Sequence, residues 1–236
     1  MKLTWLGQAG YQICTADGTR IMIDPYLSNH LELVKGVSFH REIPVAPQVF
    51  DQVPDVLVLT HIHEDHTDPE TLERLLGNEK KVTVLAPLNV WRMVRDTFGG
   101  NHNYVMFDCG IEITASGVLL RATYAAHSDE RPIGVVIQAD GQTVWHTGDT
   151  LYHRRLLTEM DGKVDALILP VNGQGNNMNA ADAARLTRRI EPRIVLPMHW
   201  DMFREYGCDV MEFVKEMEGN TETEILIPEV YREFLI

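Results

Sequence analysis

Apolar and polar positions near the start of the chain follow a strand pattern. The runs KLTWL and YQICT are short and β-prone, and Asp17-Gly18 is a typical hairpin turn before TRIMID. We therefore expect strands at residues 2–6, 11–15 and 19–24. Residues 28–53 show no clean period and are expected to form a long irregular loop, which is typical of a binding segment or a lid.

From residue 55 onward the pattern changes to strands that alternate with helices. The apolar run DVLVLT predicts a buried strand, and a helix should follow it, because Asp68 is a good N-cap, Pro69 suits the first turn and Gly77 can end it. Further helices are predicted in PLNVWRMVRDTF, in NAADAARLTRRI after the cap Asn179, and in DVMEFVKEM. Further strands are predicted in KVTVLA, YVMFD, GIEIT, VLLRATY, IGVVIQADGQTVWHT, DALILPV, RIVLPM and the closing run TEILIP. Two packed sheets with helices outside would account for this order.

Composition limits the function classes without choosing one. A chain of 236 residues with 44% hydrophobic residues can bury a sizeable core, and we expect one domain over residues 1–236. The chain has no apolar run long enough for a membrane span and no evident signal peptide, so we expect a cytoplasmic protein without a membrane partner. Its three cysteines are far apart and indicate neither a disulfide framework nor a cysteine zinc site. The formal net charge of −13 disfavours nucleic-acid binding, which needs clustered cations.

Metal-binding side chains crowd the end of the strand DVLVLT. The stretch HIHEDH places His61 and His63 two residues apart, where an extended backbone points both the same way. A tight turn would then bring Asp65 and His66 to a neighbouring point. Imidazole and carboxylate groups suit Zn, Mn or Fe. We interpret the stretch as a metal site, because a solvated surface loop does not explain why a buried strand leads straight into it.

Three other predicted strands end close to a metal-binding side chain. His127 follows VLLRATY, Asp149 follows TVWHT, and His199 follows RIVLPM. A single histidine at a strand end is more often structural, but four strand ends with the same chemistry favour one shared site. Asp24, in IDPYL, is expected to support a ligand histidine through a hydrogen bond.

The pattern His61-x-His63-x-Asp65-His66, then His127, Asp149 in TGD and His199, resembles the metallo-β-lactamase superfamily over nearly the whole chain. The resemblance implies an α/β fold, an αββα sandwich of two mixed β-sheets with helices on the outer faces. It also implies that His61, His63 and His127 hold a first metal, that Asp65, His66 and His199 hold a second, and that Asp149 bridges them. Glu64 is not an expected ligand. The flavodiiron oxygen reductases have Glu in place of His63 and carry a flavin domain, for which this chain leaves no room.

Several stretches resemble one branch, the L-ascorbate-6-phosphate lactonase-like hydrolases: WLGQAGYQI, IDPYL, TGDT, PVNGQGNNMNAADAARL and LPMHWDMF. This implies a lactonase that acts on a small, anionic, sugar-type lactone, with one or two divalent metal ions, Mn or Zn and with Fe as a further option. The catalytic candidates are Asp65 and Asp149, which could orient the nucleophile or move a proton. The substrate-binding candidates are Arg131, Arg41, Asn172 and Asn176.

Other interpretations stay open at this point. A phosphodiesterase or nuclease of the same fold is the nearest one, although the chain carries no recognisable RNA-contacting arm. Persulfide dioxygenases share the histidine pattern with a single iron. A non-catalytic metal-binding protein would be expected to have lost ligands, and all seven positions are present here. Assembly into a homo-oligomer is left open.

Overall fold

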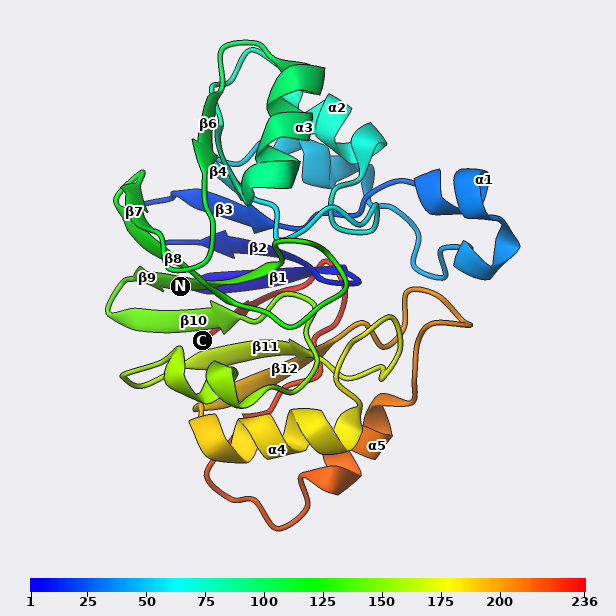
Figure 1. Ribbon diagram of the computed structural model, residues 1–236, viewed down its shortest axis with the longest axis vertical. Coiled ribbons are helices and arrows are strands. Elements are labelled where there is room, and N and C mark those ends of the chain that lie inside the picture. The colour runs from blue at the N-terminus through cyan, green and yellow to red at the C-terminus, as the bar shows by residue number, and fades with distance from the viewer.

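The computed structural model describes residues 1–236 as two seven-stranded sheets packed face to face, with helices on both outer faces (Figure 1). This is the αββα sandwich that the resemblance implied. The first sheet consists of β14 (Glu233–Leu235), β1 (Lys2–Gly7), β2 (Gly10–Cys14), β3 (Arg20–Ile23), β4 (Val56–Val58), β5 (Thr83–Ala86) and β6 (Asn103–Met106), in that order. The second consists of β13 (Glu224–Ile225), β12 (Ile194–Met198), β11 (Ala166–Pro170), β10 (Gln142–His146), β9 (Ile133–Ala139), β8 (Val118–Tyr124) and β7 (Glu112–Ala115).

Each sheet joins antiparallel hairpins to parallel strands. The pairs β3–β4, β4–β5 and β5–β6 are parallel in the first sheet, as are β10–β11 and β11–β12 in the second. The arrows of β10 and β11 point to the same end of the molecule (Figure 1). Strand β8 runs the same way, because both β8 and β10 are antiparallel to their shared neighbour β9. The carboxyl ends of β8, β10 and β12 therefore lie along one edge of the second sheet.

Helices α2 (Pro69–Leu76) and α4 (Ala180–Ile190) begin at the predicted N-caps. Helix α2 starts where the Asp68 side chain accepts a hydrogen bond from the Glu70 amide, and α4 starts at Asn179 in the same way. Helices α2 and α3 (Leu88–Phe98) pack on the outer face of the first sheet, while α4 and α5 (Val210–Glu216) cover the second. None of the helices combines the length and the apolar character needed to span a membrane.

The main core lies between the sheets and contains Trp5. Trp145 is also buried, but it packs beneath the helices of the second sheet. Two local expectations were wrong. Residues 28–53 contain helix α1 (His30–Lys35) and two 3-10 turns, η1 (Val37–Phe39) and η2 (Pro47–Asp51), and α1 projects from the body (Figure 1). The run TEILIP does not close the fold, because β14 follows it and pairs with β1.

Candidate metal centre

The loop after β4 carries the first four candidate ligands, and its entry is held rigidly. Asp24 follows β3, the strand parallel to β4, and is fully buried. Its carboxylate accepts hydrogen bonds from the amide and the hydroxyl of Thr60. The side chain of Thr67 donates to the His61 carbonyl at 2.6 Å and closes the other end of the turn. The histidine loop is thus fixed at both ends before any metal is considered.

Three histidines form the first cluster. His61 Nε2 lies 2.9 Å from His63 Nδ1, and His127 Nε2 lies 3.1 Å from the same atom. His61 and His63 leave β4 in the first sheet, whereas His127 comes from the end of β8 in the second. The ligand atoms of all three lie within 4.8 Å of one another, which is the spacing of groups that share an ion.

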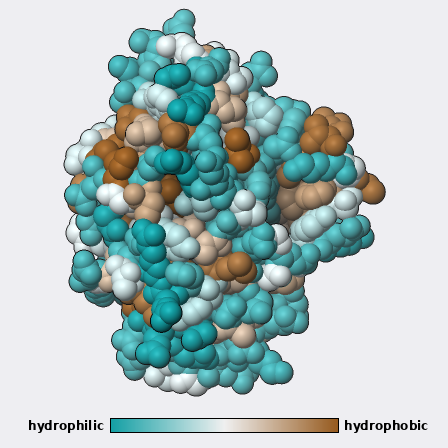
Figure 2. All heavy atoms as spheres, viewed as in Figure 1, coloured by the Kyte–Doolittle hydropathy of each residue, from teal (hydrophilic) through white to brown (hydrophobic).

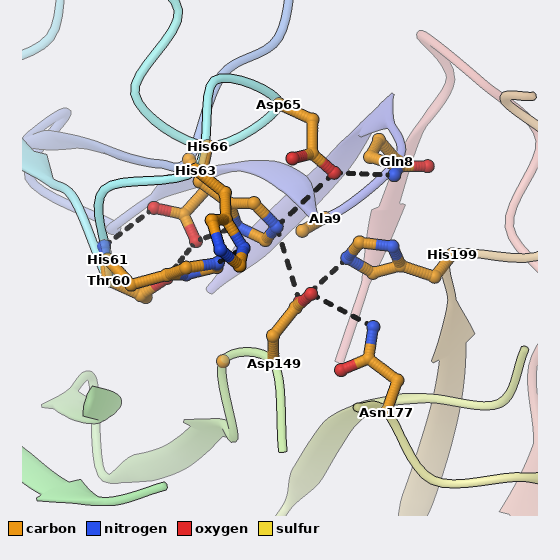
Figure 3. A network of polar contacts seen from close by, with 12 residues as sticks. Gln8, Ala9, Thr60, His61, His63, Asp65, His66, Asp149, Asn177 and His199 are labelled. Atoms are coloured by element: carbon orange, nitrogen blue, oxygen red, sulfur yellow. Dashed lines mark hydrogen bonds and ion pairs between the residues drawn. The ribbon is translucent and has the colours of Figure 1, made fainter. Parts of the chain in front are cut away.

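The second cluster contains Asp65, His66 and His199, whose ligand atoms also lie within 4.8 Å of one another. Asp149 lies between the clusters (Figure 3). Its Oδ1 atom is 2.7 Å from His199 Nε2 and 3.3 Å from His66 Nε2, and its Oδ2 atom is 3.9 Å from His127 Nε2. The structure therefore brings together all seven residues that the sequence singled out.

Buried ligand atoms without hydrogen-bond partners show that these groups fit a divalent cation. His66 Nε2, His199 Nε2 and Asp149 Oδ1 are buried and have no hydrogen-bond partner. His199 Nε2 and Asp149 Oδ1 approach as an ion pair without hydrogen-bond geometry, and His66 Nε2 lies beside the same oxygen, so the three atoms are gathered at one place. Leaving buried polar atoms unpaired costs about 1–3 kcal/mol each, and ligation to a cation removes that cost. The donor set of imidazoles and carboxylates suits Zn, Mn or Fe.

A layer of hydrogen bonds behind the ligands orients the rings. His66 Nδ1 lies 2.7 Å from Asp24 Oδ2, as expected for Asp24, and this leaves Nε2 to face the cluster. His61 Nδ1 lies 3.1 Å from the Thr60 hydroxyl. His127 Nδ1 lies 3.2 Å from the carbonyl of Asn176. Each of these three rings therefore keeps one nitrogen for the protein and turns the other toward the site.

Two amide side chains that sequence reasoning missed hold the carboxylate ligands. Gln8 Nε2 donates to Asp65 Oδ2 at 2.8 Å, and Asn177 Nδ2 donates to Asp149 Oδ2 at 2.9 Å (Figure 3). Both lie in stretches that the resemblance had marked, WLGQAG and NGQGNN, which was the available signal. Asp129 was also missed: it accepts from the Ile62 amide, between His61 and His63, and ties the His127 loop to the histidine loop.

The turn that carries Asp149 requires its glycine. Gly148 has a φ of +63°, a conformation that other residues rarely adopt, and a Cβ there would collide with the carbonyl of Ile133. His146, two residues before Gly148, is buried and spans the turn, since its Nδ1 accepts from the Gly148 amide and its Nε2 faces the Ala9 carbonyl. The TGD sequence thus places Asp149 through backbone geometry.

Burial and neighbouring charges shift the ligand pKa values in different directions. Burial lowers the pKa of His61 well below its usual value, so its ring is neutral and free to ligate. Burial disfavours the ionised form of Asp149, but positive charge on His199 and His66 outweighs it and holds that pKa well below its usual value. Burial also opposes charge on His66, yet the nearby carboxylates, Asp149 foremost, raise its pKa well above the usual value. A cation would replace the proton that His66 otherwise carries.

A cleft of about 250 Å³ opens over the metal centre, where it is lined by His63 of the first cluster, by Asp65 and His199 of the second, and by Asp149. The predicted substrate residues Asn172 and Asn176 line it, from the loop between β11 and α4. Lys35 of α1 also lines it and had not been singled out. The segment that the sequence described as a loop or lid therefore does form one side of the site.

The two predicted substrate arginines lie elsewhere. Arg41 is buried, and its guanidinium donates to the carbonyls of Tyr26 and Ile43 and to the hydroxyl of Tyr231. This corrects the expectation for Arg41, because its donors are directed at the protein and away from the cleft. Arg131 lines a neighbouring hollow beside His127 and pairs with Asp108 at 3.1 Å.

Comparison with known proteins gives the context for this geometry. A family model described as Beta-lactamase superfamily domain matches residues 2–199. A UPF0173 metal-dependent hydrolase of Methanosarcina mazei is 28% identical, over 96% of this chain and 95% of that protein. A UPF0173 protein of Pyrococcus furiosus is 30% identical, over 92% of this chain and 91% of that protein.

Solved structures share the fold over the full length. Igni18, a metallo hydrolase from the hyperthermophilic archaeon Ignicoccus hospitalis, has a TM-score of 0.80 at 24% identity and covers 100% of this chain and 98% of its own. An isothiocyanate hydrolase from Delia radicum gut bacteria has a TM-score of 0.80 at 20% identity, with 100% and 99% covered. The family model spans most of the chain and reaches His199, the last candidate ligand. This chain therefore belongs to the metallo-β-lactamase superfamily.

Proposed function

We propose that this protein is a metal-dependent hydrolase that opens small lactones or esters. One observation carries the proposal: unpaired, buried ligand atoms of His66, Asp149 and His199 converge beside an open cleft. The name of the Methanosarcina mazei relative, a metal-dependent hydrolase, supports the reaction class. Divalent cations at such a centre lower the pKa of a coordinated water to about 7 and polarise a substrate carbonyl.

The ligand roles follow the two clusters. His61, His63 and His127 would hold one cation, and Asp65, His66 and His199 would hold the other. Asp149 approaches both clusters and would be shared. We propose Mn or Zn as the metal, with Fe as a further option, because these ions accept a mixed imidazole and carboxylate set.

Asp65 and Asp149 are the proposed catalytic carboxylates. The Oδ2 atom of each is held by an amide, from Gln8 and from Asn177, so neither carboxylate can rotate freely. Both residues line the cleft. A carboxylate in a fixed position can orient a water molecule for attack and accept its proton.

A sugar-type lactone is the substrate class that the resemblance suggests. Asn172 and Asn176 line the cleft on the side of the β11–α4 loop, where amide groups can meet hydroxyl groups of a substrate. A phosphodiester is the second candidate, because paired cations also serve in-line displacement at phosphorus. Asp149 lies between the two clusters, as a ligand shared by paired cations would, and this position supports the phosphodiester as the second candidate substrate.

Proton release in weakly buffered solution tests the reaction. Protein loaded with Mn or Zn would receive a phosphorylated sugar lactone, its unphosphorylated twin and a simple phosphodiester. We expect acid release from at least one lactone and much slower release from the phosphodiester. The reverse order would assign the protein to the phosphodiesterases, and release from none of them would contradict the proposal.

The His61→Ala variant tests the metal assignment. It removes a buried ligand of the first cluster, so activity should fall by at least about a hundredfold with a matching loss of bound metal. His40→Ala is the matched control, because His40 is exposed and outside both clusters. Metal content measured by elemental analysis separates loss of ligand from loss of catalysis. Full activity and full metal content in His61→Ala would rule out its ligand role.

A further inference from the structure

One part of the lining of the metal cleft is apolar, and the remaining side chains are polar or charged. Leu31, Phe39, Phe203 and Tyr206 form this apolar part, here called the aromatic wall. Most of the rest of the lining comes from four candidate metal ligands and from the amide-rich loop of residues 172–177. The proposed hydrolase function accounts for the ligand side alone.

The aromatic wall is built from two segments that stack on each other. Phe39 of η1 lies against Tyr206, with ring centroids 4.5 Å apart and an angle of 19° between the planes. Phe39 also meets the edge of Phe203 at 5.6 Å, and Phe203 packs on the buried ring of Tyr26 at 5.6 Å. Offset and edge-on pairs of this kind are stable arrangements of aromatic rings.

Backbone contacts hold the two segments in register, so the wall exists before any substrate arrives. The Glu42 amide donates to the Met202 carbonyl at 2.9 Å, and Arg41 and Phe203 form an isolated β-bridge. On the other side, Asn172 Nδ2 donates to the Tyr206 carbonyl at 3.0 Å. A preformed apolar wall loses little conformational entropy when it binds a flat group.

Apart from the cations that the candidate ligands would hold, the side chains of the cleft offer little to an anion. Lys35 is its only lining lysine or arginine, and its ammonium group lies 2.9 Å from a carboxylate oxygen of Glu64. Asp65 and Asp149 are proposed cation ligands, so any positive charge from bound metal lies on their side of the cleft and not at the aromatic wall. Arg41 is directed elsewhere, and Arg131 lies in the neighbouring hollow. A phosphate group at the wall would therefore be desolvated without a free cation to receive it.

We propose that the substrate is an uncharged ester or lactone with a flat apolar group that lies against Phe39 and Tyr206 while its carbonyl faces the metal centre. This inference rests on the proposed hydrolase function and narrows its substrate class. The cleft, at about 250 Å³, lies just below the lower end of the usual size range of ligand pockets, which is about 300 Å³. Its size therefore limits the substrate to a small molecule.

Matched lactones test the wall in catalysis. The metal-loaded protein would receive γ-phenyl-γ-butyrolactone, its γ-methyl analogue, and the phenyl lactone with a sulfonate on the ring. The leaving oxygen is that of a secondary alcohol in all three but is benzylic in the two phenyl lactones. Each kcat/KM is therefore divided by the rate constant for hydroxide-catalysed hydrolysis of the same lactone, so that differences report on the side group. We expect this normalised kcat/KM to be roughly tenfold higher for the phenyl lactone than for the other two, the scale of burying one ring.

Variants of the wall assign the preference to named residues. Phe39→Ala should remove most of the phenyl preference and change the methyl lactone by less than about twofold. Val37→Ala is the matched control, because Val37 belongs to the same 3-10 turn but is 80% exposed. Figure 2 shows apolar side chains at the outer end of this projecting segment. Tyr206→Ala provides a second test, since Tyr206 is 37% exposed and its loss should leave the fold intact.

A binding measurement separates this inference from the proposed function. Benzohydroxamate and acetohydroxamate carry the same metal-binding head, which loses a proton when it chelates the metal, with a ring or a methyl group attached. Calorimetry on the Mn- or Zn-loaded protein compares the two. The aromatic wall is supported if benzohydroxamate binds more tightly than acetohydroxamate and if this preference is lost in Phe39→Ala but kept in Val37→Ala. If no lactone is cleaved while this preference is present, only the proposed function is overturned. Equal binding of both, or preference for the sulfonated lactone, overturns the wall.

Discussion

At the scale of single residues, one buried carboxylate organises the start of the site. Asp24 accepts from the Thr60 amide at 2.8 Å and faces His66 Nδ1 at 2.7 Å. The first contact positions the loop, and the second fixes the proton of His66 on Nδ1, so that Nε2 presents its lone pair. Asp24 itself has a φ of +42°, a conformation that is uncommon outside glycine. The backbone accepts this conformation where the carboxylate has to face both partners.

We predict that Asp24→Asn weakens metal binding by about 10- to 100-fold without unfolding the protein. An amide in place of Oδ2 would direct its donors at the donors of His66 and Thr60, so the ring would lose its fixed orientation. Titration against a chelator of known affinity measures the effect. Asp17→Asn is the control, because Asp17 lies in the exposed hairpin turn after β2. Unchanged metal affinity in Asp24→Asn would show that the contact does not support the ligand.

At the scale of elements, Asp55 fixes the strand that delivers the ligand loop. Its amide donates to the Arg20 carbonyl at 2.9 Å, and its carboxylate accepts from the Arg20 amide at 2.8 Å, which sets the register of β3 and β4. Lys80 adds an ion pair at 2.8 Å. Burial raises the pKa of Asp55, but the hydrogen bonds from Arg20 and Lys80 outweigh it and lower the pKa below its usual value.

This lowered pKa predicts a pH-dependent loss of stability. A carboxyl group with a depressed pKa in the folded state contributes fully above its unfolded pKa, and the contribution fades as the pH falls through the folded value. Asp55→Asn should lower the free energy of unfolding by about 1 kcal/mol at pH 7. The difference between wild type and variant should shrink as the pH drops below 3.8, the ordinary value for this group.

Urea unfolding of the metal-free protein at neutral and acidic pH measures this difference. Asp51→Asn serves as the control, because Asp51 is an exposed aspartate at the end of η2. A difference that stays constant across the pH range would exclude the ionised carboxylate as its cause.

At the scale of the whole molecule, the metal centre joins the two sheets. His61, His63, Asp65 and His66 follow β4 of the first sheet, while the remaining candidate ligands, His127, Asp149 and His199, follow β8, β10 and β12 of the second. Ions held between these groups would connect the sheets at one end of the sandwich. Without ions, buried polar atoms of both halves stay unpaired and oppose close packing there.

Metal removal should therefore destabilise the entire fold. A cation at a hundred times its dissociation constant stabilises the native state by about 2.7 kcal/mol, and in a chain of this size 1 kcal/mol shifts Tm by about 2–4 °C. We expect Tm to fall by about 5–10 °C on chelation and to recover when Zn or Mn is restored. Calorimetric melting measures the shift, with His61→Ala as a variant that should respond less. Identical Tm values with and without metal would contradict a centre that joins the sheets.

Local sequence failed where an element depends on contacts with distant parts of the chain. Helix α1 has six residues with only Leu31 buried, so it shows no apolar period. Strand β14 is three residues long with an exposed Leu235, and it exists because β1 offers a free edge. Arg41 was expected at the substrate for its charge, but its position was decided by carbonyl groups of Tyr26 and Ile43.

The sequence alone determined the order of strands and helices apart from α1 and β14, the helix caps at Asp68 and Asn179, and the seven candidate ligands. Caps, apolar periods and the HIHEDH spacing are local patterns that the sequence shows directly. Only the tertiary structure decided that Gln8 and Asn177 hold the two carboxylates and that Phe39 meets Tyr206 over the cleft. Those contacts join residues 28 to 167 positions apart. Such pairs depend on which loops the folded sheets bring to the same edge, and no local pattern encodes that.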